Sequence, residues 1–443
     1  MQEVICGGRS LPGAASPVHL HDVAAFGRNA DEIRSVAARH GVPLQVFFAR
    51  KANKAIEYVR QAERLGLGVD TASDVELSQT LAVGLPAERV IITAAVKQRP
   101  LMELAVREGC VVAIDNLDEL RLLAQVTTEL GRGRRSRAML RVSGFEHDGH
   151  KLPSRFGVDI DQAAGFVSTC WPEEVELVGA HFHLDGYDAA QRVSAIRQTV
   201  PLIGHLKAEG HPVAFLDIGG GFPMSYLDDP AQWLAFRQVV DEGHAGITWD
   251  GTPYRTAAGR WSTYPYWQSP TRGDWFDGLL GEVAPLLRES GLELRCEPGR
   301  SLLDGCGMTV AEVVYRKRLT IVGQPGDWAI GLAMNRTQCR TTSEDFLVDP
   351  LLLVGESGDH PGQDRTGPID GYLAGAYCME SEFLTKRRLR FPQGVAVGDR
   401  IAFPNTAGYL MHFLESRSHQ FPLAENFVWD DGEWMSDPID AGL

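Results

Sequence analysis

Eight short apolar runs separated by helix-like segments are the feature that most constrains the fold of this 443-residue chain. In segments such as AIEYVRQAERLG, apolar residues recur every three or four positions, which is the period of an amphipathic helix. Buried parallel strands read as continuous apolar runs, so alternating strand and helix units predict a (β/α)8 barrel of about 250 residues. An open doubly wound α/β sheet is the alternative. The runs span 45–49, 66–72, 89–95, 110–116, 138–143, 176–183, 213–219 and 292–297.

The character of the sequence changes after residue 300. Segments such as GMTVAEVVYRKRLTIVG and VAVGDRIAFPN are rich in β-branched and aromatic residues with turns between them. We therefore expect the barrel at 25–295, and a second, all-β domain at 296–443 that is joined by residues 1–24, where SPVHLHD has a strand pattern. The stretch 225–275 is rich in Trp, Tyr, Pro and Gly and is long for a strand-to-helix connection, which predicts an insertion or lid near the barrel mouth.

Charge and cysteine usage narrow the class of protein. With 43 Lys+Arg against 58 Asp+Glu, the net charge of −15 argues against nucleic acid or an anionic membrane as a partner. The seven cysteines form no CxxC pair, which disfavours a disulfide framework or zinc ribbon and favours a reducing compartment. We find neither a signal-peptide pattern nor an apolar run of about 18 residues, so we expect a cytoplasmic protein.

Reactive residues gather where the predicted strands end. In a barrel the carboxyl ends of the strands converge on one mouth, where active sites lie. The sequence therefore predicts one site built from several strand ends. Its members are Lys51 after the first run, Asp70 in the second, His181 and His183 in the sixth, Gly219, Gly220 and Gly221 after the seventh, and Glu297 and Arg300 after the eighth.

Each of these residues has a chemical and a structural interpretation. Lys51, in FFARKANK, would be nucleophilic if a desolvated site lowers the pKa of its amine, or it is an exposed residue at a strand end. The glycines of LDIGGGFP can present consecutive N–H groups to an anion such as phosphate, or form a tight structural turn. In CEPGR, Glu297 can hold a protonated pyridine nitrogen and Arg300 can meet a phosphate, or the two can form a salt bridge.

The segment HFHLDG places His181 and His183 on the same side of one strand. One of these histidines can pack flat on a cofactor ring. The pair can instead bind a metal ion, as in metal-dependent barrel hydrolases, or one can be a hydrogen-bonded core residue. All three interpretations stay open for this segment.

Taken in order over residues 17–415, the motifs resemble those of the fold type III pyridoxal-phosphate decarboxylases, the family of diaminopimelate, ornithine and arginine decarboxylases. LDIGGGFP and CEPGR resemble that family's phosphate-binding and pyridine-nitrogen segments. The other matches pair FFARKAN with YAxKAN, GVDTASDVEL with DxASxxEL, SRFGV with RFG, HFHLDGY with HxHIGS, GAYCMESEFL with GPxCExxDxL, and NTAGYLMHF with a GAY segment.

The resemblance implies a cofactor, a reaction and a set of residues. Lys51 would carry pyridoxal 5'-phosphate as a Schiff base, His183 would stack on the ring, and an amino acid would lose its carboxylate through a carbanion that the ring stabilises. Cys378 would enter the site from the neighbouring subunit of a homodimer with shared active sites, whose interface includes the β domain. No metal is implied. The implied catalytic residues are Lys51, Cys378 and His183, and the implied cofactor contacts are Lys51, Asp70, Arg155, His183, Gly219, Gly220, Gly221, Glu297, Arg300 and Tyr409.

The sequence also departs from the family pattern, mainly where substrate recognition is expected. The phosphate-binding serine of HIGS is missing from HLDG, and MNDxxRP appears only as MNRTQCR. Arg340 and Glu380 are the nearest candidates for substrate contacts, while Glu344, Asp345 and Asp349 offer acids in the same region. A diamino acid needs an acid at the far end of its pocket and diaminopimelate needs an arginine, so the substrate stays open.

Three other functions remain as alternatives to decarboxylation. A racemase or epimerase would use the same cofactor with two acid–base groups on opposite faces. A metal-dependent barrel hydrolase would use His181 and His183 as ligands. A catalytically inactive relative would bind a partner in place of a substrate.

Overall fold

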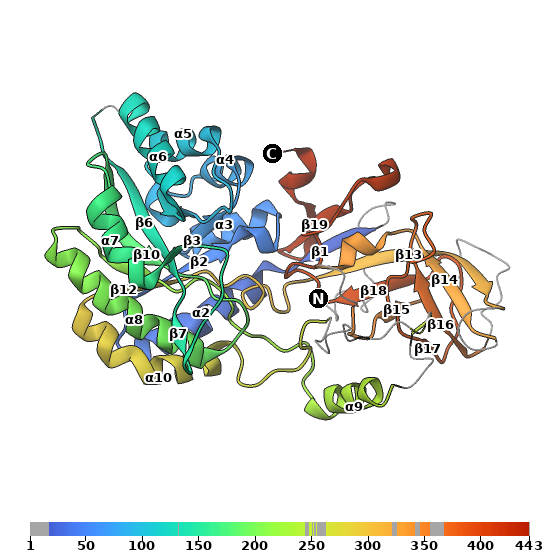
Figure 1. The fold of residues 1–443 in the computed structure, drawn as a ribbon. Coiled ribbons are helices and arrows are strands. Elements are labelled where there is room, and N and C mark those ends of the chain that lie inside the picture. Colours follow the sequence, from blue (N-terminus) through green and yellow to red (C-terminus); the bar gives the residue numbers. More distant parts are fainter. Residues whose placement is uncertain are drawn as a thin grey trace.

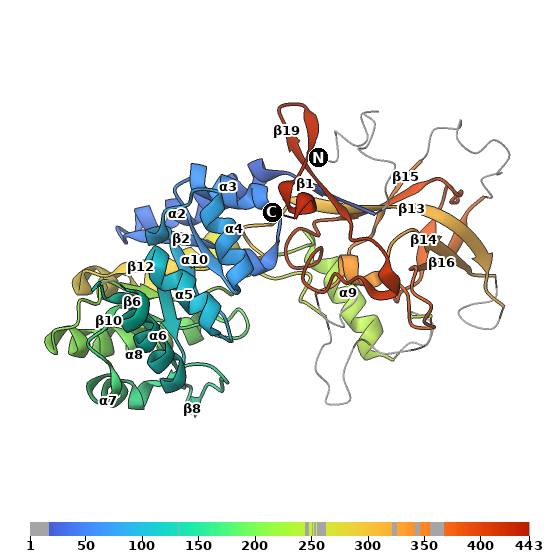
Figure 2. The same ribbon diagram turned by 90° about the horizontal axis from the view of Figure 1, so that it is seen from above.

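The computed structural model describes residues 17–131, 133–243, 248–249, 251, 254, 263–320, 326–341, 346–354 and 367–442. They form a barrel surrounded by helices and a separate sheet-rich domain beside it (Figure 1). Seen from above, the two parts lie side by side and are joined near strands β1 and β13 (Figure 2).

The barrel closes through parallel pairing all the way round. Leu294 in the last strand pairs with Leu44 in the first, and each strand between pairs with its neighbours in sequence order. Every strand overlaps one of the eight predicted runs, so the predicted barrel is confirmed and the open sheet is wrong. The strands are β2 (Leu44–Ala49), β3 (Gly68–Thr71), β4 (Val90–Ile92), β5 (Val111–Ile114), β6 (Ser136–Ser143), β10 (Val175–His181), β11 (Phe215–Asp217) and β12 (Glu293–Cys296).

Amphipathic helices cover the outside of the barrel. The helix α3 (Ile56–Arg64) buries Ile56, Val59 and Ala62, which share one face at the expected spacing. Helix starts follow local signals: Ser73 and Asn116 cap α4 (Asp74–Ala82) and α6 (Leu117–Leu130) through their side chains. The remaining barrel helices are α2 (Val23–Arg39), α5 (Arg99–Glu108), α7 (Ile160–Cys170), α8 (Ala189–Ala208) and α10 (Arg272–Ser290). A buried cluster of Phe47, Ile91, Val111, Ala113, Met139 and Phe215 comes from strands β2, β4, β5, β6 and β11.

The second domain is a sheet that includes the beginning of the described chain. Strand β1 (Val18–His21) pairs antiparallel with β13 (Gly307–Arg318) and parallel with β19 (Glu425–Asp430). Residues such as Ile330, Leu373 and Phe403 form its core. The other strands are β14 (Trp328–Leu332), β15 (Leu351–Leu353), β16 (Ile369–Ala374), β17 (Leu389–Phe391), β18 (Arg400–Pro404) and β20 (Glu433–Ser436).

The segment after strand β2 is anchored on the β domain. Tyr409 donates its backbone N–H to the Ala52 carbonyl at 2.8 Å. The Asn53 side chain donates to the Ala407 carbonyl at 3.0 Å, and the Lys54 N–H donates to His412 Nδ1 at 3.1 Å. These contacts fix the backbone around Lys51 from a distant part of the chain.

A long connection joins β11 to α10 and contains helix α9 (Pro230–Asp241). This helix lies apart from the other barrel helices, toward the β domain, in both views (Figures 1 and 2). The aromatic side chains of Trp233, Tyr264 and Tyr266 form a buried cluster in this connection. Among the described residues, no helix has the length and apolar character needed to span a bilayer.

Candidate active site

A cavity of about 750 Å³ opens at the carboxyl ends of the barrel strands. This volume lies within the range of small-molecule and cofactor sites. Its lining comes from several connections that follow barrel strands and from the β domain. It includes the predicted residues Arg155, His183, Gly220, Gly221, Glu297, Arg300 and Tyr409.

Lys51 and Asp70 form an ion pair at the ends of two neighbouring strands. Lys51 lies in a single 3₁₀ turn, Arg50–Ala52, directly after β2. Its Nζ is 3.0 Å from Asp70 Oδ2, while Thr93 donates to the other Asp70 oxygen at 2.6 Å. The side chain of Asp70 is 1% exposed and that of Lys51 is 29% exposed. The buried carboxylate therefore faces an amine that is still accessible.

The expected lowering of the Lys51 pKa is wrong. Burial alone would lower it, but Asp70, Tyr409 and Glu297 together raise the pKa of Lys51 above its usual value. Burial raises the pKa of Asp70 to about 6, although Lys51 and Thr93 oppose that change. Desolvation alone predicts the opposite direction, because it leaves out the two carboxylates near the amine. Before Lys51 can act as a nucleophile its proton must leave, and Asp70 is placed to accept it.

Glu297 is a buried carboxylate whose hydrogen-bonding capacity is unfilled. His181 Nε2 lies 3.1 Å from one oxygen and His183 Nδ1 lies 3.8 Å from the other. Neither Glu297 oxygen makes a well-aligned hydrogen bond within the described structure. Burial would raise the Glu297 pKa, but His181, His183 and Lys51 hold the pKa well below its usual range. A buried anion of this kind is stabilised by a cationic N–H donor entering the cavity.

The two histidines have different surroundings. Burial lowers the pKa of His181 to about 4, so its ring is neutral at pH 7 beside Glu297. His183 is 31% exposed at its side chain and lines the cavity, where Gly220 N–H points at its Nδ1 at 3.3 Å. His183 is thus the histidine available to pack on a ring in the cavity, and His181 is a core residue.

The glycine turn after β11 is tightly confined. A Cβ at Gly220 would lie 2.8 Å from the Glu297 carbonyl oxygen and 3.2 Å from the His183 ring. Gly221 has φ +79°, and a Cβ there would overlap the Arg192 guanidinium. Both glycines also border the cavity. The packing around the turn therefore requires glycine at both positions. The absence of side chains also leaves the backbone of the turn accessible to a ligand in the cavity.

Arg300 is held among tyrosines. Its Nη1 donates to Tyr226 Oη at 2.8 Å and to the Gly408 carbonyl at 3.2 Å. The guanidinium carbon lies 4.2 Å from the centre of the Tyr264 ring and 5.2 Å from that of Tyr409. Within the described part of the chain, the salt bridge to Glu297 that the sequence left open is not formed. Arg300 therefore keeps its charge available to an anion in the cavity.

Other predicted residues lie at the rim or outside this cavity. Arg155 is exposed at the rim, with its guanidinium 3.9 Å from the Phe156 ring centre. Cys378 and Glu380 are exposed in the turn after β16 and do not line the cavity of their own chain. Arg340 is buried elsewhere and donates to the Phe383 carbonyl at 2.6 Å.

Of the acids considered as substrate contacts in this region, the structure describes Asp349, which does not line this cavity. Asp349 is exposed and pairs with Arg387 at 2.6 Å. Glu344 and Asp345 lie outside the described residues.

The cavity also contains residues that the sequence analysis missed. Arg141 at the end of β6 is 7% exposed and lies 3.6 Å from Asp115. Its position at a strand end was the signal that could have identified it. The set of unpredicted lining residues includes Arg141, Asp185, Tyr187, Thr341 and Phe413.

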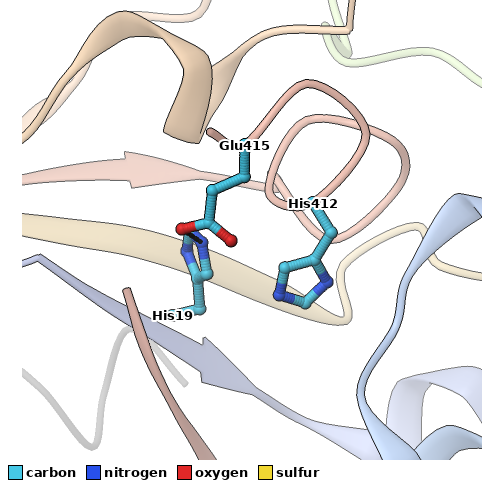
Figure 3. A group of neighbouring side chains, drawn as sticks. All are labelled: His19, His412 and Glu415. Atoms are coloured by element: carbon cyan, nitrogen blue, oxygen red, sulfur yellow. Dashed lines mark ion pairs between the residues drawn. The ribbon is translucent and has the colours of Figure 1, made fainter. Parts of the chain in front are cut away.

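Two groups of potential metal ligands exist among the described residues. Figure 3 shows one of them, formed by His19, His412 and Glu415. His412 accepts from the Lys54 N–H at 3.1 Å and faces the Asn426 side-chain oxygen at 2.9 Å, so both of its ring nitrogens are engaged. This pattern fits a buried hydrogen-bond network better than a metal site.

The second group consists of His181, Asp217 and Glu297. Burial raises the pKa of Asp217 well above its usual value, with Glu297 acting in the same direction. This environment disfavours the charged form of the Asp217 carboxyl, which is the form that a metal ion prefers. His183, the partner of His181 in the proposed metal pair, is not a member of this group. The geometry thus disfavours the alternative in which His181 and His183 bind a metal ion.

Comparisons with known proteins agree with this geometry. Residues 27–243 match the family model described as the pyridoxal-binding domain of pyridoxal-dependent decarboxylases. The chain is 30% identical to a diaminopimelate decarboxylase of Corynebacterium efficiens, over 88% of this chain and 78% of the relative. It is 28% identical to an uncharacterised protein, y4yA, of Sinorhizobium fredii, over 94% of this chain and 89% of the relative.

A solved structure shares the fold. Diaminopimelate decarboxylase from Helicobacter pylori complexed with L-lysine superposes with a TM-score of 0.70, covering 98% of this chain and 95% of that one. The sequence identity of that pair is 18%, so this likeness concerns the fold alone.

Proposed function

Because this chain belongs to the pyridoxal-dependent decarboxylase family, we propose that it binds pyridoxal phosphate through Lys51 and decarboxylates an amino acid. The observation that carries the proposal is the buried, ionised Glu297 carboxylate, which lacks a well-aligned hydrogen bond in the described structure and borders the cavity. A protonated pyridine nitrogen is the kind of donor that would supply the missing hydrogen bond to Glu297.

The residues fit the two ends of the cofactor. Glu297 would hold the ring nitrogen, and His183 would pack on the ring face. Arg300 and the turn at Gly220 and Gly221 would hold the phosphate, because they combine a cation with closely approaching backbone. Lys51, beside Asp70, would supply the amine that carries the cofactor.

The cofactor, when bound, supplies an electron-withdrawing ring that accepts the electron pair of a bond broken at Cα. Asp70 would receive a proton from Lys51, since their atoms lie 3.0 Å apart. Glu297 would keep a proton on the ring nitrogen, since its pKa is held well below its usual range. His183 would restrict the ring to one orientation.

Decarboxylation breaks the bond between Cα and the carboxylate carbon, releases carbon dioxide, and requires one proton at Cα. Lys51 Nζ is one donor for this proton. We propose that the partner subunit's Cys378 is the other, because Cys378 is exposed and lies outside the cavity of its own chain. This assignment requires a homodimer with shared active sites.

We propose that the substrate is an α-amino acid of the class used by diaminopimelate, ornithine or arginine decarboxylases. The test is incubation with diaminopimelate, ornithine, arginine and lysine in deuterated water. We expect carbon dioxide release and one deuterium at Cα of the product, and neither with Lys51→Ala. A protein that binds pyridoxal phosphate but releases no carbon dioxide from any of these amino acids would contradict the proposal.

The same experiment distinguishes decarboxylation from racemisation, the second candidate. Lys51 and Cys378 are two acid–base groups that a racemase would need on opposite faces of Cα. Racemisation would place deuterium in amino acid that keeps its carboxylate. We expect Cys378→Ala to change the ratio of decarboxylated to deuterated, intact amino acid, and an unchanged ratio would remove Cys378 from the mechanism.

A further inference from the structure

The anion end of the cavity, by which we mean the part lined by Gly220, Gly221 and Arg300, has an unusual composition. In the segment 183–187, HLDGY, a glycine stands where the resemblance leads us to expect a phosphate-binding serine. Tyr187 follows this glycine directly and lines the cavity together with Gly220, Gly221 and Arg300. A hydroxyl is thus brought to the same cavity by the next residue in the chain.

The backbone of Tyr187 is fixed relative to the glycine turn. Arg192 is fully buried, and its Nη2 donates to the Gly186 carbonyl at 2.9 Å and to the Gly220 carbonyl at 3.2 Å. Trp275 Nε1 donates to the Tyr187 carbonyl at 2.9 Å. These contacts join the two loops that border the anion end of the cavity, so the position of Tyr187 is set by buried side chains.

The Tyr187 side chain lies next to the tyrosine that packs on Arg300. The Tyr187 ring meets the Tyr264 ring edge-on at 5.4 Å between centres, and the Tyr264 ring centre lies 4.2 Å from the Arg300 guanidinium carbon. Burial is the main reason that the pKa of Tyr187 is raised, so the hydroxyl keeps its proton at neutral pH. A protonated hydroxyl beside a guanidinium is a suitable pair of donors for a phosphate.

The connection between β11 and α10 supports this arrangement from outside. Tyr226 accepts a hydrogen bond from Arg300 at 2.8 Å, and the Tyr264 ring lies under the guanidinium at 4.2 Å. Neither tyrosine is among the residues that line the cavity. Tyr226 and Tyr264 are therefore positioning residues for Arg300 and Tyr187.

We propose that the Tyr187 hydroxyl binds the phosphate of pyridoxal phosphate together with Arg300 and the glycine turn, in place of the missing serine. This inference depends on the proposed function, since it assigns a further residue to the same cofactor site. It also gives the aromatic segment around Tyr226 and Tyr264 a purpose, which is to hold the two phosphate donors.

The test compares two ligands that differ only by the phosphate. Cofactor-free protein is titrated with pyridoxal phosphate and with pyridoxal, for the wild type and for Tyr187→Phe, which removes only the hydroxyl. We expect the dissociation constant of pyridoxal phosphate to rise on the order of tenfold, as for loss of a hydrogen bond to a charged group, and that of pyridoxal to stay unchanged. Tyr226→Phe is expected to give a smaller loss with the same selectivity.

Tyr315→Phe is the matched control, because Tyr315 lies on β13 and is 43% exposed. It should change neither dissociation constant. Wild-type protein that does not prefer pyridoxal phosphate over pyridoxal would refute the phosphate site and the proposed function with it. A wild type that has this preference, combined with a Tyr187→Phe protein that keeps it in full, would overturn the role of Tyr187 and leave the proposed function intact.

Discussion

Glu297→Gln tests whether the negative charge of Glu297 contributes to the rate of the proposed reaction. Glutamine keeps the size and shape of the side chain but removes its negative charge, so a protonated ring nitrogen would lose its ionic partner. Glu297 is 1% exposed. For such a buried group, a hydrogen bond between charged partners is worth about 1.5–3 kcal/mol. Because about 1.4 kcal/mol corresponds to tenfold in rate, we expect kcat to fall by about 10- to 150-fold.

The assay is single-turnover carbon dioxide release from protein whose cofactor content has been measured. The pKa of Glu297 is held well below its usual range, so the ratio of wild-type to variant rates should be constant across the neutral pH range. Glu415→Gln is the control, because it changes a buried carboxylate outside the cavity and should leave kcat unchanged. A Glu297→Gln protein with full cofactor and an unchanged rate would refute the assigned role.

Two other predictions concern stability and cofactor binding. The pKa of Glu415 is held at about 2, because contacts with His19 and His412 outweigh the opposing effect of burial. The folded-state pKa is thus lower than the ordinary 4.5, so the ionised carboxylate contributes about 3 kcal/mol of stability above pH 4.5 that is lost as the pH falls toward 2. Urea unfolding should show Glu415→Gln less stable than wild type near neutral pH and equal to it in strong acid; a pH-independent difference would contradict this. Gly220→Ala places a Cβ 2.8 Å from the Glu297 carbonyl oxygen, so we expect weaker binding of pyridoxal phosphate in a direct titration, and unchanged affinity would show that the turn can relax.

The barrel could be predicted because its strands carry a simple signal. Buried parallel strands have no solvent-facing side, so each appears as an uninterrupted apolar run, and the polar residue that ends it marks the mouth. Lys51, Glu297 and Arg300 were predicted in this way. Arg141 is also near a strand end, but it lies inside the apolar run rather than after it and was passed over.

Properties that depend on several distant residues could not be predicted. The pKa of Lys51 is raised by Asp70 on β3 and by Glu297 directly after β12. The direction of this pKa shift therefore cannot be predicted from the segment around Lys51 alone. The role of Tyr187 depends on Arg300 and Tyr264, which lie more than a hundred and more than seventy positions away in the sequence. Cys378 lies outside the cavity of its own chain, so its proposed role requires a second subunit, which a single sequence does not display.

The attachment of the cofactor to Lys51 is the central claim, and borohydride reduction followed by peptide mapping tests it most directly. Protein loaded with pyridoxal phosphate is reduced, digested and analysed by mass spectrometry. We expect loss of the visible absorbance band and a pyridoxyl group on Lys51, and the same modification in Lys54→Ala, which changes a neighbouring exposed lysine. Lys51→Ala should show neither band nor label. A label on another lysine, or protein that takes up no pyridoxal phosphate, would contradict the account.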